Sequence, residues 1–134
     1  MPIETMARTF LSLGSLFGLV SVVAGAFGSH ILREQLPDEM LDTFTLATRY
    51  QMYHALALLA LGSFWGRISI RSGCLAGYSF GAGTILFSGT LYVYSLTGER
   101  WWAMLTPIGG LALIAGWGFL LWACWFQYAE QKSL

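Results

Sequence analysis

Long stretches without any charged side chain constrain this sequence more than any other feature. Four of them cover residues 9–32, 50–66, 72–98 and 101–129, with 24, 17, 27 and 29 residues. A helix that crosses the hydrocarbon core of a bilayer needs about 20 mostly apolar residues, so three stretches are long enough and the second is short. The pattern predicts an all-α protein, a four-helix transmembrane bundle.

The composition supports the same fold class. Only 10% of the 134 residues are charged and 56% are hydrophobic, whereas a soluble domain carries about 25% charged residues. Too few charged side chains remain to cover a surface that faces water. We therefore expect one integral membrane domain over residues 1–134, an antiparallel up-down bundle whose first partner is the lipid bilayer.

The predicted spans need one addition before the second helix. Pro37, followed by Asp38 and Glu39, is typical of a helix start, so an amphipathic interfacial segment should precede the second span, continuous with it or bent near Arg49. Pro107 is interpreted as the first turn of the fourth helix, capped by Thr106. The predicted spans are approximately residues 9–29, 50–66, 73–96 and 107–129.

The basic residues favour one orientation. With both termini in the cytoplasm, that side carries four basic residues and the opposite side three, which follows the positive-inside rule. The first hydrophobic stretch also has the pattern of a signal peptide, but we expect it to be retained as the first helix, in a bacterial inner membrane. The four residues are Arg8, Arg67, Arg71 and Lys132, and the three are Arg33, Arg49 and Arg100.

Small residues recur at helical spacing in two of the predicted helices. In lipid, such stripes allow helix backbones to approach closely, because helix association there depends on packing. We interpret both stripes as packing seams, against a helix of the same chain or of a second protein. The positions are Gly14, Gly18, Ser21, Gly25 and Gly28 in the first helix, and Gly73, Gly77 and Gly81 in the third.

A few polar residues interrupt the apolar pattern and form a candidate binding site. Tyr50, Gln51 and His54 share one side of the second helix with apolar residues, so they should point into the bundle. Arg49 lies on another side of the same helix and marks the membrane boundary, about one turn from His54. His30 lies at the end of the first helix and could meet His54, so we include it in the candidate site. Ionisable groups inside a membrane are functional candidates by default.

The sequence contains little that indicates catalysis or a cofactor. Two histidines without a nearby carboxylate or thiol make a weak metal site, and no glycine-rich phosphate loop is present. Cys74 and Cys124 lie in hydrophobic stretches outside any CxxC motif, so we expect buried thiols, although a disulfide between them stays open. Zero net charge gives no reason to expect nucleic acid. We predict neither an enzyme nor a bound metal or cofactor.

Four ordered motifs resemble a known family. They are GAFGSH at 25–30, RYQMYHALALLALG at 49–62, LFSGTLYVYSLTG at 86–98, and TPIGG at 106–110 followed by Gly116-Trp117. In this order and spacing, over about residues 10–118, they resemble domain-of-unknown-function family 423, the bacterial relatives of transmembrane protein 256. Ser29 departs from the alanine usual in the first motif. The resemblance implies a small four-span membrane protein without established catalytic residues.

Two functions are compatible with these observations. In the first, the protein is a non-catalytic accessory or assembly subunit of a membrane complex, and its polar cluster is structural. In the second, it is a homo-oligomer that binds or transports a small molecule, lipid or quinone. The site would then be His30, Tyr50, Gln51 and His54, with Arg49 at its edge.

Overall fold

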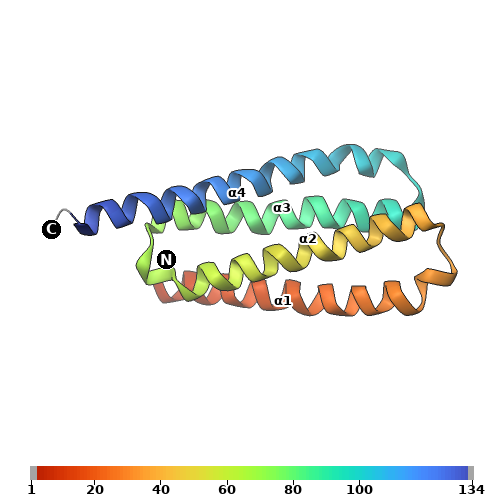
Figure 1. Ribbon diagram of the computed structural model, residues 1–134, viewed down its shortest axis with the longest axis horizontal. Helices are drawn as coiled ribbons and strands as arrows, with labels where there is room; N and C mark the ends of the chain where they lie inside the picture. The colour runs from red at the N-terminus through yellow and green to blue at the C-terminus, as the bar shows by residue number, and fades with distance from the viewer. Residues whose placement is uncertain (1–2, 133–134) are drawn as a thin grey trace.

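Four long helices make up almost the whole chain, and they run up and down beside one another (Figure 1). The computed structural model describes residues 3–132, with side chains described from 4 to 125. Both ends of this part lie at the same end of the molecule, as an even number of antiparallel helices requires. The helices are α1 (Ile3–His30), α2 (Asp38–Ser63), α3 (Ile70–Thr97) and α4 (Arg100–Lys132), with short 3-10 turns η1 (Leu32–Glu34) and η2 (Trp65–Arg67).

The second helix begins where the sequence predicts. Pro37 precedes it, and the carbonyl of Pro37 accepts the first bonds from the N–H groups of Met40 and Leu41. The helix is unbroken over its 26 residues, about 39 Å, so no bend occurs near Arg49. The expected amphipathic segment is therefore the first half of α2 itself, which carries Asp38 and its neighbouring acids.

The fourth helix begins earlier than expected, and the predicted cap at Thr106 is wrong. Gly98 ends α3 in the left-handed conformation, with φ 73° and its N–H bonded to the carbonyl of Tyr94 at 2.8 Å. Two residues later α4 starts at Arg100, which places Pro107 inside the helix. Neighbouring helices allow prolines within transmembrane helices, and here the Thr106 hydroxyl lies 2.8 Å from that of Thr90 on α3.

Three of the four helices in the described part are long and apolar enough to cross a membrane, namely α1, α3 and α4. The second helix does not reach this level, because its apolar half still contains Arg49, Gln51 and His54. It nevertheless lies alongside the others over its length (Figure 1).

Helices that follow each other in sequence pack against each other, so the bundle is a row rather than a closed ring. The interfaces are α1 with α2, α2 with α3, and α3 with α4, whereas α1 and α4 form no comparable pair in the described residues. Phe10 of α1 reaches across to the Tyr78 ring on α3, at 5.8 Å between centroids. The two edge helices therefore turn much of their surface outward.

Most of the predicted small-residue positions do pack inside the chain. A methyl group on Gly14 would lie 2.8 Å from the carbonyl oxygen of Ala55, and one on Gly28 would lie 3.0 Å from the Phe44 ring. In α3, Gly77 fits against the Phe10 ring and Gly81 against Leu13. The remaining predicted positions with an internal neighbour are Gly18 near Ala55, Ser21 bonded to α2, and Gly73 near Trp65.

Gly25 is the exception, since no atom lies within 4 Å of the place where its side chain would begin. The sequence prediction also missed the glycines between α3 and α4. Gly109 contacts the backbone of Phe87, so no larger residue fits there without moving one helix. Two others fit against side chains across the same interface, Gly83 against Leu113 and Gly116 against Phe80.

Both cysteines are free thiols. Cys74 is half-buried, but Cys124 is exposed on α4, so the expectation that both thiols are buried is wrong for Cys124. α4 lies at the edge of the row and turns many apolar side chains outward. Cys124 is one of them, because a free cysteine behaves as a small apolar residue.

Candidate functional site

Gln51 is the central polar residue of the bundle. It lies on α2, is 5% exposed, and bonds to two other helices. Its side-chain nitrogen donates to the carbonyl of Phe17 on α1 at 2.9 Å, and its side-chain oxygen accepts from the Tyr92 hydroxyl on α3 at 2.8 Å. One amide therefore joins three helices, as expected for a buried polar group in lipid.

Two serines bond to the backbone of α2 near the same level. Ser21 of α1 donates to the carbonyl of Thr48 at 2.7 Å, and Ser88 of α3 donates to the carbonyl of Ala47 at 2.8 Å. Helix carbonyls can accept a second bond without losing their helical partner. Together Ser21, Gln51, Ser88 and Tyr92 form what we call the polar layer, which holds α1, α2 and α3 in register.

His54 lies one turn beyond Gln51 and is 4% exposed. Its Nδ1 is 2.6 Å from the carbonyl oxygen of Tyr50, and its Nε2 is 3.1 Å from the indole nitrogen of Trp117 on α4. Because an indole N–H can only donate, Nε2 accepts and Nδ1 carries the proton. Both ring nitrogens are thus occupied within the chain, which leaves neither for a metal.

Aromatic rings surround His54 on three sides. The ring of Phe80 is 5.6 Å away and that of Trp117 is 6.0 Å away, measured between centroids. Tyr50 stacks on Phe87 of α3 at 4.5 Å with an angle of 30° between the planes. The predicted inward orientation of Gln51 and His54 is confirmed, while Tyr50 is half-buried.

The structure does not bring the other two candidate residues to this place. Arg49 is exposed on the outer side of α2. His30 is exposed at the end of α1, 13 residues beyond Phe17, which bonds to Gln51. At 1.5 Å per residue, this separation is about 20 Å along the helix. The expected meeting of His30 and His54 is therefore wrong.

The partners of the cluster on α3 and α4 were not predicted as site residues. Tyr92 on α3 is half-buried and bonded to Gln51. Trp117 follows Gly116, and the absence of a side chain at Gly116 leaves room for the Phe80 ring beneath it. The Gly116-Trp117 pair in the fourth motif was the signal that could have identified Trp117.

A groove opens beside His54. Its volume is about 500 Å³, which lies within the range of small-molecule sites. Its walls come from α2, α3 and α4 and are mainly aromatic and aliphatic. The lining residues are Tyr50, Tyr53, His54, Phe87, Gly110, Leu113, Ile114 and Trp117.

Two buried polar atoms in the described part of the chain lack a hydrogen-bond partner, the indole nitrogen of Trp65 and the hydroxyl of Thr84. Thr84 lies one turn before Ser88 on α3, and the Trp65 ring is tilted by 56° against the Phe10 ring, with 5.2 Å between centroids. Neither atom lines the groove beside His54. Within the same residues, no three histidine, cysteine, aspartate or glutamate side chains gather as they would around a metal ion.

Comparison with known proteins places the chain among bacterial membrane proteins. Residues 24–110 match the family model described as protein of unknown function DUF423. A UPF0382 membrane protein of Staphylococcus aureus is 43% identical, over 91% of this chain and 98% of its own length. The UPF0382 membrane protein YwdK of Bacillus subtilis is 39% identical, over 82% of this chain and 90% of its own length.

A third relative is named as an inner membrane protein. The UPF0382 inner membrane protein YgdD of Escherichia coli is 35% identical, over 86% of this chain and 88% of its own length. No solved structure matches the chain. The family model spans the first three motifs and TPIGG of the fourth, and three helices have the length and apolar character of membrane spans. This chain is a membrane protein and belongs to the DUF423 family.

Proposed function

We propose that this protein is a non-catalytic accessory or assembly subunit, which packs laterally against other membrane subunits or a second copy of itself. The observation that supports it is the difference between edge and inner helices. In an apolar 18-residue stretch of each helix, 17% of the residues are buried in α1 and in α4, against 50% in α3. The edge helices thus offer long surfaces, and a side chain added at Gly25 on α1 would meet no other helix of the described residues within 4 Å.

The state of the polar residues supports a structural role for them. Gln51 uses one amide hydrogen and its side-chain oxygen, and His54 uses both ring nitrogens, in bonds inside the chain. A binding or catalytic group would need at least one of these atoms free for its ligand. These side chains thus connect α2 to the other helices of the same chain, and we propose no reaction for them.

We further propose that α2 crosses the membrane with the other helices, both termini being cytoplasmic. Its length of about 39 Å exceeds the hydrocarbon core of about 30 Å, and internal bonds satisfy Gln51 and His54. Among described side chains, the end of the bundle near the N-terminus carries Arg8, Arg67 and Arg71 against Glu4 alone. This excess of basic residues favours the cytoplasmic side for that end.

Site-directed photocrosslinking in native membranes tests the assembly role. A photoreactive amino acid replaces Val22 on α1 or Ile114 on α4, which are 61% and 69% exposed. Matched controls replace Leu56 on α2 or Ile85 on α3, which are 55% and 61% exposed. We expect discrete protein adducts at an edge helix and none at the controls. The mass of the adduct distinguishes a second copy from another subunit, and the absence of protein adducts at both edges would refute the proposal.

The groove beside His54 favours a second candidate, the binding of a small apolar molecule such as a quinone. Gly110 lines the groove, and a side chain there would first meet the Phe87 ring at 3.7 Å, an ordinary contact. Gly110→Leu should therefore fill the groove without displacing His54. Native mass spectrometry of gently extracted protein tests this. A bound mass lost in Gly110→Leu but kept in Gly25→Leu would support this candidate over the first.

A further inference from the structure

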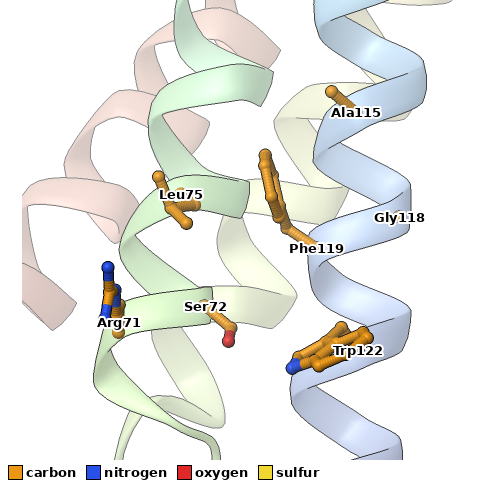
Figure 2. A pocket seen from close by; sticks show the side chains of 7 residues that line it. All are labelled: Arg71, Ser72, Leu75, Ala115, Gly118, Phe119 and Trp122. Carbon is orange, nitrogen blue, oxygen red and sulfur yellow. The ribbon is translucent and has the colours of Figure 1, made fainter.

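A second groove lies between α3 and α4 at the basic end of the bundle (Figure 2). Its volume is about 580 Å³. Figure 2 shows Phe119 and Trp122 extending from α4 toward α3, with Arg71 and Leu75 on the α3 side. The indole nitrogen of Trp122 is on the edge of the ring that faces α3. The lining residues are Arg71, Ser72, Leu75, Ala115, Gly118, Phe119 and Trp122.

The groove is polar at one end and apolar along its length. Arg71 and Ser72 belong to the first turn of α3, whereas Ala115 lies seven residues before Trp122 on α4, about 10 Å deeper along the helix. The 28 residues of α3 span about 42 Å, against about 30 Å of hydrocarbon. The first turn of α3 thus reaches the headgroup layer, and the deeper wall faces acyl chains.

Arg71 supplies a positive charge at the polar end. It is exposed and forms no ion pair or hydrogen bond with any described residue. The nearby Arg67 in η2 adds a second positive charge to the same end. The opposite end of the bundle has five acids against three arginines, so an anionic ligand is favoured at this end over that one. The five acids are Glu34, Asp38, Glu39, Asp42 and Glu99.

We propose that this groove binds one anionic phospholipid. The acyl chain would lie against Leu75, Ala115 and Phe119, and the phosphate would accept hydrogen bonds from the Arg71 guanidinium and the Ser72 hydroxyl. A guanidinium binds phosphate oxygens in a forked geometry that an amide side chain cannot reproduce. The amphiphilic groove matches a lipid better than the same end of a second copy, because that end is itself basic, with Arg8, Arg67 and Arg71 against Glu4 among the described side chains.

This inference does not depend on the proposed assembly role, and lipid retention tests it directly. The full-length protein is delipidated in mild detergent and then returned to nanodiscs of phosphatidylglycerol mixed with phosphatidylcholine. Native mass spectrometry after release counts the lipids that stay bound. For the unmodified protein we expect one retained phosphatidylglycerol, not displaced by inorganic phosphate. Arg71→Gln should reduce its retention about five-fold, the equivalent of about 1 kcal/mol for one basic residue at a membrane surface.

Two further variants separate the charge from the groove. Gly118→Leu adds a side chain where no atom lies within 4 Å, so it should block the groove and abolish retention while Arg71 stays in place. Arg71→Lys should restore part of the retention and thereby exclude misfolding as the cause. The matched controls are Arg33→Gln at the acidic end and Gly25→Leu on α1, both with unchanged retention.

Three results would overturn the proposal. Equal retention of phosphatidylcholine and phosphatidylglycerol would remove the role of Arg71, and unchanged retention in Gly118→Leu would place the lipid elsewhere. A dimer that dissociates in Gly118→Leu, without any retained lipid in the unmodified protein, would assign the groove to a second copy of the chain.

Discussion

The two sides of α3 associate with their neighbours in different ways. Toward α2 the contact is polar, with Gln51, Ser88 and Tyr92 in hydrogen bonds that cross between the two helices. Toward α4 the contact is largely one of close approach, where Gly109 lies against the backbone of Phe87. The hydroxyl pair of Thr90 and Thr106 is a smaller polar addition to that interface.

The difference follows from the solvent. Lipid gives apolar helices no hydrophobic reason to associate, so they rely on backbone approach or on polar bonds. An interface of the first kind should be sensitive to any added atom, while one of the second kind should be sensitive to a lost donor or acceptor. Adding an atom at the first kind of interface and removing a polar group from the second kind tests the distinction.

The largest effect is expected from Gly109→Ala in the close-approach interface. The new methyl group would overlap the backbone of Phe87, and a backbone cannot rotate away as a side chain can. Overpacking of this kind costs about 3 kcal/mol. Unfolding of the purified protein in detergent with increasing sodium dodecyl sulfate measures the change.

The matched control is Gly118→Ala on the same helix, where no atom lies within 4 Å of the added methyl group. It should leave the unfolding free energy unchanged to within about 0.5 kcal/mol. Equal destabilisation by both substitutions would show that helix propensity or lipid contacts dominate, and the close-approach description of the interface would fail.

Removing the polar group of Gln51 should have the next largest effect. Gln51→Leu keeps most of the volume but removes the bonds to Phe17 and Tyr92. Such bonds in a membrane protein contribute about 0.6 kcal/mol on average and about 1.7 kcal/mol at most, so for the two bonds of this buried amide we expect a loss of about 2 kcal/mol in the same unfolding assay.

A double-mutant cycle isolates the bond to α3. Tyr92→Phe removes the hydroxyl that would otherwise be left without its acceptor, so Gln51→Leu should cost less in that background. A coupling energy of about 1 kcal/mol is expected. Strictly additive effects would mean that the Tyr92 hydroxyl contributes nothing through Gln51, contrary to its distance of 2.8 Å.

An intermediate effect is expected for Trp117→Phe, which retains an aromatic ring but deletes the donor to His54. The buried Nε2 atom would lose its bond, at a cost of about 1 kcal/mol. Trp125→Phe on the same helix is the control, since Trp125 is 71% exposed. If Trp117→Phe leaves stability unchanged but removes a bound small molecule, His54 belongs to a binding site instead.

The sequence was a good guide wherever one helix could be considered alone. The uncharged stretches predicted the helices, and the position of Gln51 and His54 on the apolar side of α2 predicted their burial. Pro37 and the acids after it correctly marked the start of α2. Each of these features follows from helical periodicity or from chemistry at one helix end.

Features that depend on two helices were harder to predict. Thr106 and Pro107 have the local pattern of a helix start, but α4 is already formed at Arg100, and the Thr106 hydroxyl bonds across to α3. The distance between His30 and His54 depends on how far α1 extends past the polar layer. Which glycines face a neighbour depends on the crossing geometry, which is why Gly25 was included and Gly109 was missed.

The smallest effect, and the finest test of the comparison, is expected from Ser21→Ala. Ser21 bonds across to α2 at the Thr48 carbonyl, whereas Ser29 bonds only to the Gly25 carbonyl of its own helix and is exposed. Ser21→Ala should therefore cost about 0.6 kcal/mol, the mean for such bonds in a membrane protein, and Ser29→Ala nothing measurable. Both substitutions remove one hydroxyl from α1, so a difference between them reports only whether the bond joins two helices. Equal effects would mean that the Ser21 bond does not hold α1 to α2, which would leave the close contacts at Gly14 and Gly28 as the main basis of that interface.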